Sequence, residues 1–190
     1  MLTGWIGSGK SAALEEFRRL GAAVLSSDEV VHAIYADTVV IDTVCRRFGP
    51  AALTADGHVD RTALGALAFA EPDGMAFLEQ LVHPRVGAAR EAWQDAQRRR
   101  SPRPPLLVCE VPLLFEAGLV DAFDAVLVVT ASQSIRRDRV TARGQDFSAR
   151  SGRQMTEDDK IKRADRYLVN DGSMAQLEEW VAERFEEYRT

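Results

Sequence analysis

Hydrophobic positions recur with helical spacing along much of the chain. In residues 9–20 the apolar side chains share one helical face, and Gly21 follows where a glycine commonly ends a helix. Residues 28–48 and 60–100 show the same periodicity. Residues 29–100 are therefore predicted to be helical throughout, apart from short breaks, and contain no expected strand.

Short runs that are apolar throughout interrupt this pattern elsewhere in the chain. Such runs are typical of strands that are buried on both faces of a parallel sheet. An arginine-rich helix and a terminal amphipathic helix, the latter after a capping box at Ser173 and Gln176, separate or follow them. Strands that alternate with helices predict an α/β fold of three layers with a parallel sheet. The predicted strands are residues 22–25, 106–109, 125–129 and 167–169.

We expect residues 1–190 to form a single domain with distinct parts. Residues 1–28 and 101–190 are predicted to form its sheet-bearing core. Residues 29–100 are too long for one crossover, so they are expected to project as a helical subdomain that covers a substrate. The polar segment 144–155, rich in arginine and glycine, is predicted to be a mobile lid.

The composition argues against several classes of binding partner and metal site. The chain has 29 acidic and 24 basic residues and a formal net charge of -5, so nucleic acid is not expected as the main partner. Cys45 and Cys109 have no ligand-spaced neighbours, which argues against a disulfide framework or a zinc site. The sequence shows neither a secretory signal nor a membrane-length apolar run. We expect a cytoplasmic protein that is a monomer or a weak homo-oligomer.

The segment Gly4–Ser11 matches the phosphate-binding pattern G-x-x-x-x-G-K-[ST], and it lies between a predicted strand and a predicted helix. Its glycines allow backbone N–H groups to turn toward a nucleotide phosphate. Gly4, Gly7, Ser8 and Gly9 are therefore predicted to contact the nucleotide. The alternative is an ordinary glycine-rich turn between a strand and a helix.

The end of this loop carries the chemistry that ATP and Mg²⁺ require. Lys10 can reach the β- and γ-phosphates, and the hydroxyl of Ser11 can complete the Mg²⁺ shell. Ala12 follows where a second hydroxyl residue is common, so a side-chain contact to phosphate is missing there. The strand before the loop is short, because only Met1–Thr3 precede it.

Two carboxylates are expected at the phosphate-binding edge of the sheet. Asp28 follows the second strand, which is predicted to lie beside the first. It is a candidate general base or Mg²⁺ holder, and the alternative is that it only caps the next helix. Glu110 directly follows the apolar run 106–109. This is the position of a Walker-B acid, an acidic residue at the carboxyl end of a buried strand beside a phosphate loop. The alternative for Glu110 is a glutamate that leaves the strand for solvent.

Arginines follow the next predicted strand. Arg136, Arg139 and Arg143 share one helical face, which is usually a solvated basic face. Kinases also need guanidinium groups that neutralise charge on the transferred phosphoryl group. Arg150 or Arg153, in the predicted lid, can supply one of these groups.

Ordered motifs extend along nearly the whole chain. They are Thr3–Ser11 (compared with T-G-G-I-G-S-G-K-S), Asp28 (last acid of D-A-D), Leu81–Pro84 (L-L-H-P), Glu110–Glu116 (D-x-P-L-L-F-E), Arg139 and Arg143 (R-x-x-x-R), Arg150–Gln154 (R-x-x-x-Q) and Ala164–Gly172 (A-D-x-x-I-x-N-x-G). Together these motifs resemble those of the dephospho-CoA kinase family. The resemblance implies ATP-dependent phosphorylation of the ribose 3′-hydroxyl of dephospho-CoA, which gives CoA and ADP in the last step of coenzyme A biosynthesis.

The resemblance also implies roles for single residues. It makes Asp28 the general base, with Lys10 and Arg139 as further catalytic residues, and places Asn170 and Gly172 near the adenine. Arg143 is expected to bind the nucleotide. The residues expected to bind the acceptor are His32, His83, Glu110, Leu113 and Arg150. A histidine before proline, as at residues 83–84, can instead mark a helix-ending turn.

Departures from the family pattern leave other functions open. Trp5 replaces a glycine, Ser26 replaces the first acid of D-A-D, His32 stands where arginine is common, and Glu110 replaces aspartate. The alternatives are another small-molecule kinase of nucleoside monophosphate or shikimate type, and a nucleotide-binding protein without catalysis. A GTP-binding switch is disfavoured, because N-K-x-D and D-x-x-G segments are missing.

Overall fold

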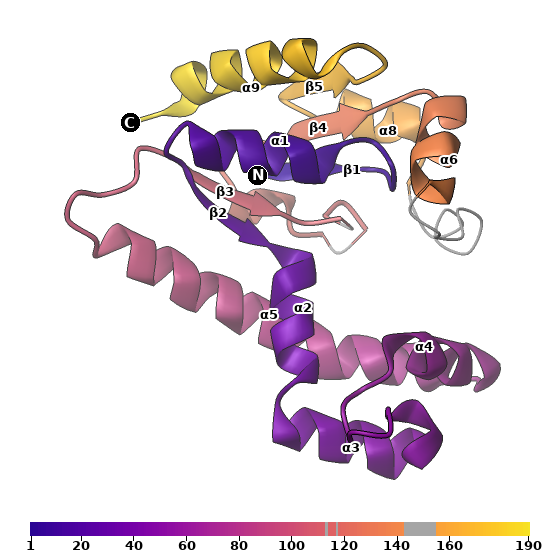
Figure 1. The fold of residues 1–190 in the computed structure, drawn as a ribbon. Coiled ribbons are helices and arrows are strands. Elements are labelled where there is room, and N and C mark those ends of the chain that lie inside the picture. Colours follow the sequence, from indigo (N-terminus) through magenta and orange to yellow (C-terminus); the bar gives the residue numbers. More distant parts are fainter. Residues whose placement is uncertain (113, 117, 143–154) are drawn as a thin grey trace. The chain divides into compact units, whose positions relative to one another are not determined.

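The computed structural model describes residues 1–112, 114–116, 118–142 and 155–190 of the chain (Figure 1). They divide into two compact units. The first, Met1–Ser26 with Gln97–Thr190, contains the sheet. The second, Ser27–Ala96, is helical.

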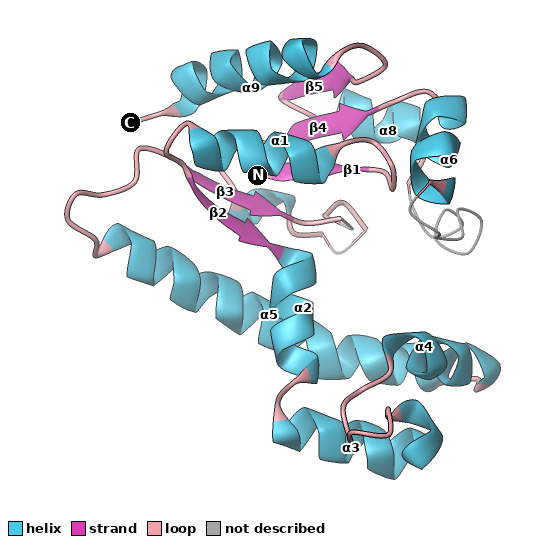
Figure 2. Cartoon of the chain, viewed as in Figure 1, coloured by secondary structure: helices cyan, strands magenta, loops and turns pink. Residues whose placement is uncertain are grey.

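The first unit contains a parallel sheet of five strands in the order β2-β3-β1-β4-β5 (Figure 2). This confirms the predicted α/β class. The expectation that the second strand lies beside the first is wrong, because β3 separates them. The crossover from β1 to β2 through α1 skips one position, which β3 later fills. The strands are β1 (Leu2–Gly4), β2 (Ala23–Ser26), β3 (Leu107–Glu110), β4 (Leu127–Thr130) and β5 (Arg166–Val169).

Helices α1 (Lys10–Arg19) and α9 (Met174–Tyr188) cover one face of this sheet (Figure 1). Phe17 of α1 and Leu177 of α9 are almost completely buried against apolar side chains of the strands. The predicted capping box of α9 is present, since the side chain and the backbone of Ser173 each bond to Gln176. The unit also contains α6 (Gln133–Thr141), α8 (Glu157–Lys162) and the short 3-10 helix η2 (Val120–Ala122).

A second apolar cluster lies on the opposite face of the sheet. Val128 points into it, whereas its strand neighbours Leu127 and Val129 belong to the cluster under α1 and α9. The interior strand β4 is therefore buried on both faces, as its uninterrupted apolar run predicts. The buried members of this second cluster are Met1, Trp5, Leu114, Phe115, Val126 and Val128.

The second unit packs its helices around its own core, in which Val44, Leu64 and Ala68 are almost fully buried. The predicted helical stretch 28–48 is two helices, because Asp37 accepts the N–H of Val39 and starts a new one. The elements are α2 (Ser27–Tyr35), α3 (Thr38–Phe48), the 3-10 helix η1 (Pro50–Ala52), α4 (Arg61–Ala70) and most of α5 (Gly74–Arg98).

The predicted break at His83-Pro84 is wrong, because α5 continues through it. Proline removes one hydrogen bond from the helix. Leu78, Leu81 and Val82 are buried in the core of the unit, and this packing holds the helix together across the proline. Within the described ranges, none of the helices is long and apolar enough to cross a membrane.

Candidate active site

The segment Gly4–Ser11 connects β1 to α1 and forms a tight loop. Gly4, Gly7 and Gly9 have φ values of 149°, 77° and 103°, a region that favours glycine. A Cβ atom at Gly7 would lie 2.5 Å from the carbonyl oxygen of Arg136, and one at Gly9 would lie 2.3 Å from Nδ2 of Asn170. These glycines are therefore needed for both the backbone conformation and the close approach of neighbouring elements.

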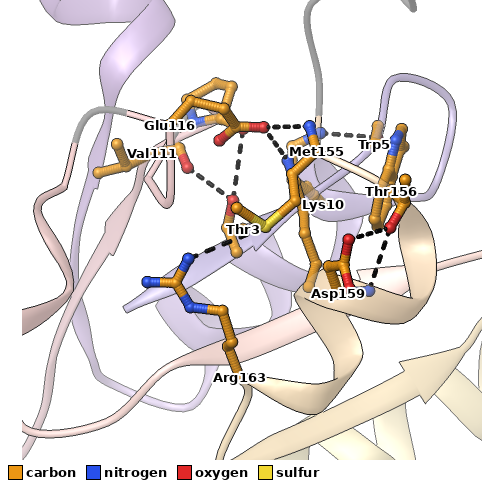
Figure 3. A network of polar contacts seen from close by, with 11 residues as sticks. Thr3, Trp5, Lys10, Val111, Glu116, Met155, Thr156, Asp159 and Arg163 are labelled. Atoms are coloured by element: carbon orange, nitrogen blue, oxygen red, sulfur yellow. Dashed lines mark hydrogen bonds and ion pairs between the residues drawn. The ribbon is translucent and has the colours of Figure 1, made fainter.

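Lys10 points back into this loop, which we call the phosphate loop. Its Nζ donates to the carbonyl oxygen of Trp5 at 2.8 Å (Figure 3) and lies 4.0 Å from a carboxylate oxygen of Glu110. The side chain of Lys10 is only 11% exposed, so its ammonium group is held by the protein close to the start of α1.

Glu110 is buried at the carboxyl end of β3, so the alternative of a glutamate that leaves the strand for solvent is wrong. Besides its contact with Lys10, it accepts a hydrogen bond from Oγ of Ser26 at 3.2 Å. Both residues depart from the family pattern. The longer glutamate and the serine at the end of the neighbouring strand β2 contact each other, so the two departures compensate locally.

Arg139 and Asn170 brace the phosphate loop from outside. Arg139 donates to the carbonyl oxygens of Gly7 and Ser8 at 3.4 and 3.5 Å and to that of Asn170 at 3.1 Å. The side-chain amide of Asn170 donates to the carbonyl oxygen of Ser8 at 2.9 Å.

Arg136 is buried and donates to the carbonyl oxygen of Ala131 at 2.7 Å. The reading of these arginines as a solvated face is therefore wrong for Arg136 and Arg139.

Asp28 lies in the first turn of α2, directly after β2, and its side chain is exposed. Asp28 is therefore a residue within α2 and not the residue that precedes the helix. His32 is exposed on the same helix, and His83 is exposed within α5. The interpretation of His83 as part of a helix-ending turn is wrong, because the helix continues past it. All three residues belong to the second unit.

Some predicted site residues lie outside the described residues. These are Leu113, Arg143, Arg150 and Arg153, together with all of the predicted lid 144–155 except Met155.

Comparison with known proteins identifies the family to which this chain belongs. A family model of dephospho-CoA kinase matches residues 1–176, which include the phosphate loop, the helical unit and the Asn170 segment. The chain belongs to the dephospho-CoA kinase family. This confirms the resemblance predicted from its motifs and does not favour the nucleoside monophosphate or shikimate kinase alternative.

Individual dephospho-CoA kinases and solved structures are also similar to this chain. The chain is 39% identical over 178 residues to the enzyme of Symbiobacterium thermophilum, covering 91% of this chain and 74% of that protein. It is 38% identical over 181 residues to that of Deinococcus radiodurans, covering 93% and 86%. A crystal structure of a Thermus thermophilus protein matches with a TM-score of 0.80 and 35% identity, covering 98% and 95%. Dephospho-CoA kinase from Campylobacter jejuni shares the fold, with a TM-score of 0.70, 24% identity and coverage of 98% and 94%.

In this dephospho-CoA kinase family member, the other predicted nucleotide residues lie on the surface or in the packing around the loop. Ser11 is exposed in the first turn of α1, and Ala12 packs against the core under that helix. A Cβ atom at Gly172 would lie 1.7 Å from Oε1 of Gln176. Gly172 therefore leaves room for the capping box of α9, and its contact with adenine stays a prediction.

The sequence did not predict an ion pair beside Trp5 in which the lysine is buried and the glutamate partly exposed. Lys160 of α8 is completely buried, and its Nζ lies 2.9 Å from Oε1 of Glu116 and 4.7 Å from the centre of the Trp5 ring. Glu116 also accepts the backbone N–H of Met155 at 2.7 Å (Figure 3). Lys160 was not predicted to be buried, because the sequence of α8, E-D-D-K-I-K, is typical of a solvent-exposed helix. The available sequence signal for this ion pair was Glu116, which ends a segment that resembles the family.

The environment of Glu116 favours its carboxylate form. Burial by itself raises the pKa of this carboxyl group, but the hydrogen bond from the backbone N–H of Met155 and the nearby Lys160 ammonium group together lower the pKa below the ordinary glutamate value. A lowered pKa in the folded state means that the stabilisation is complete above the unfolded-state value of about 4.5. It is lost as the pH falls through the lower folded-state pKa.

We therefore predict a pH-dependent effect of Glu116→Gln on thermal stability. At neutral pH the variant should melt at a lower temperature than the wild type, because glutamine cannot compensate the buried ammonium group of Lys160. This difference should shrink as the pH falls below about 4.5. Melting curves from neutral pH to about pH 3 measure it, with Glu179→Gln on the exposed side of α9 as control. A difference that does not change with pH would contradict the stabilising role of the carboxylate.

Proposed function

We propose that this chain transfers the γ-phosphoryl group of ATP to the ribose 3′-hydroxyl of dephospho-CoA and releases CoA and ADP, which completes coenzyme A biosynthesis. The observation that carries the proposal is the dephospho-CoA kinase match over residues 1–176. The proposed location is the cytoplasm. Neither a nucleic acid nor a membrane is proposed as a partner, and a monomer or weak homo-oligomer stays a prediction.

The phosphate loop fits a polyanionic nucleotide. Within the described part of the chain, the buried hydroxyl of Ser8 has no hydrogen-bond partner, and a buried hydroxyl in that state costs free energy. A phosphate oxygen would satisfy it. The amino-terminal end of α1 adds a positive dipole, and Lys10, held beside this end, carries a full positive charge. We propose that Lys10 exchanges its contact with the carbonyl oxygen of Trp5 for the β- and γ-phosphates.

Mg²⁺ is proposed to bind through the nucleotide and Ser11. Among the described residues, no group of three or more histidine, cysteine, aspartate or glutamate side chains could hold a metal ion. This fits Mg²⁺ at a phosphate loop, where the ion keeps several waters and is bound largely by phosphate oxygens. The exposed Ser11 hydroxyl in the first turn of α1 would be its protein ligand. When bound, the ion neutralises charge on the β- and γ-phosphates.

Proton transfer is assigned to Asp28. As O3′ forms its bond to the γ-phosphorus and the bond to the β–γ bridging oxygen breaks, the hydroxyl proton must leave O3′. Asp28, in the first turn of the helix that follows β2, is the proposed acceptor. Arg139 is proposed to support the reaction by fixing the loop carbonyls of Gly7 and Ser8. The roles of Asn170, Gly172 and Arg143 near the nucleotide and of His32, His83, Glu110, Leu113 and Arg150 near the acceptor stay predictions.

The proposed acceptor is tested by measuring ADP release from ATP and Mg²⁺ with dephospho-CoA, AMP, GMP or shikimate. We expect release that depends on dephospho-CoA and stays at background with the other three compounds. ADP release stimulated by AMP, GMP or shikimate but not by dephospho-CoA would contradict the proposal.

A further inference from the structure

Trp5 is an unusual residue for a phosphate loop, because the family pattern has glycine at this position. Its side chain is 6% exposed and belongs to the apolar cluster formed with Met1, Leu114 and Val128. The bulky ring therefore does not extend into solvent beside the loop. It anchors the loop to the face of the sheet opposite α1 and α9.

Two cations lie near this ring. The Lys160 ammonium nitrogen is 4.7 Å from the ring centre, and Cζ of the Arg136 guanidinium is 5.7 Å from it. Cations within about 6 Å of an aromatic centre are attracted by the ring quadrupole, and most strongly where water is excluded. Lys160 is completely buried and Arg136 is 8% exposed.

The two cations are themselves fixed by other groups. Glu116 lies 2.9 Å from the Lys160 nitrogen and is held in turn by the backbone N–H of Met155. Arg136 donates to the carbonyl oxygen of Ala131 and lies 3.5 Å from Glu157. Since the charges cannot move freely, they restrict the position of the indole between them.

The backbone of Trp5 connects this arrangement to Lys10. The carbonyl oxygen of Trp5 accepts hydrogen bonds from Nζ of Lys10 at 2.8 Å and from the backbone N–H of Ser8 at 3.3 Å. Ring and carbonyl belong to one residue, so fixing the ring restricts the direction of the carbonyl. Glycine, which lacks a side chain, cannot be fixed in this way.

We propose that Trp5 is a positioning residue of the phosphate loop. Its indole, held by Lys160 and Arg136, orients the carbonyl that holds the Lys10 ammonium group at the loop until ATP takes over this contact. This inference rests on the proposed function, because it concerns the same ATP site. It predicts that the Glu116–Lys160 ion pair acts on ATP use through Trp5, although neither partner is proposed to touch the nucleotide.

The first test compares Trp5→Leu with Trp5→Phe. We expect Trp5→Leu to lower kcat/KM for ATP about tenfold, which corresponds to about 1.4 kcal/mol, while KM for dephospho-CoA stays near the wild-type value. Trp5→Phe keeps an aromatic face and should remain within about threefold of the wild type.

Trp180 offers a matched control in the same unit. It is partly buried on α9, and Cζ of Arg184 lies 5.9 Å from its ring centre. Trp180→Leu removes a comparable ring and cation contact and should lower the melting temperature, but it should leave kcat/KM for ATP unchanged. A Trp5→Leu variant with the same kinetic parameters as Trp180→Leu would overturn the positioning role.

A double-mutant cycle tests the connection to the Glu116–Lys160 ion pair. Trp5→Leu and Lys160→Met should be non-additive in kcat/KM for ATP, whereas Trp180→Leu and Lys160→Met should be additive. Lys160→Arg, which keeps a cation, should lose less activity than Lys160→Met. If Trp5→Leu does not fold, the kinetics of Lys160→Met alone test the proposal. This variant keeps the Trp5 ring and should still lower kcat/KM for ATP while KM for dephospho-CoA stays near the wild-type value. Additive effects of Trp5→Leu and Lys160→Met, or unchanged kinetics of Lys160→Met, would overturn the proposal.

The wild-type protein separates this inference from the proposed function. A wild type that releases no ADP with dephospho-CoA refutes the function itself. A wild type that is active, with variants that change ATP and dephospho-CoA parameters equally, refutes only the positioning role of Trp5.

Discussion

Asp28→Asn is expected to lower turnover with dephospho-CoA roughly 10²- to 10⁴-fold, the usual contribution of a general base. Asparagine has nearly the same size as aspartate but cannot take the proton of the attacking hydroxyl. ATP binding should barely change, because Asp28 is not among the proposed nucleotide contacts. Steady-state turnover and ATP affinity of the folded variant measure both effects.

Glu29 provides the control for this prediction, because it is exposed in the same first turn of α2. Glu29→Gln removes one negative charge from the same helix end, where each such charge contributes about 0.3–1 kcal/mol through the helix dipole. It should leave turnover near the wild-type value. Near-normal turnover of Asp28→Asn would exclude Asp28 as the base, and a joint loss of Mg²⁺ dependence and ATP affinity would indicate a metal-holding role instead.

Lys10→Ala is expected to reduce kcat by at least about 10²- to 10³-fold, the range measured when one group that stabilises transition-state charge is removed. The ammonium group of Lys10 is the loop cation proposed to follow the migrating phosphoryl group. ATP should also bind more weakly, because the variant loses a contact with the β- and γ-phosphates. Single-turnover rates and ATP titrations separate the two losses.

The variant must remain folded for this result to be informative. Lys10 lies 4.0 Å from the buried carboxylate of Glu110, so its loss also leaves that carboxylate less compensated. Lys10→Met keeps most of the apolar stem, and melting curves of both variants report the structural cost. Lys162→Ala, at an exposed lysine of α8, serves as control and should change neither stability nor turnover. Unchanged turnover of a folded Lys10→Ala variant would refute the phosphate-loop assignment.

The sequence predicted the elements well where local signals and burial agree. The all-apolar runs 106–109 and 125–129 correspond to β3 and β4, and the capping box at Ser173 is present at the start of α9. Strand order was not predictable from the same signals, because β3 comes from a segment that follows the whole helical unit and still inserts between β1 and β2. The sequence pattern also led to the wrong prediction of a helix break at the proline in α5. The burial of Leu81 and Val82, which supports the helix there, depends on packing that the sequence pattern does not show.

The candidate site was predictable wherever a motif fixes the backbone. The phosphate loop has its expected place between β1 and α1, and Lys10 turns back onto that loop. The buried Lys160 was missed because a lysine in a charged helix normally reaches solvent. Only the three-dimensional arrangement brings it to Glu116 and Trp5. That arrangement also explains how a tryptophan fits into this loop.

The most direct test of the account is the identity of the product formed from ATP and dephospho-CoA by the purified wild-type protein. Phosphorus NMR and mass spectrometry should show one added phosphoryl group, present as a monoester on the ribose 3′-oxygen, with one ADP formed per product molecule. A phosphoryl group on any other oxygen of the acceptor, or ATP consumption without a phosphorylated acceptor, would contradict the account.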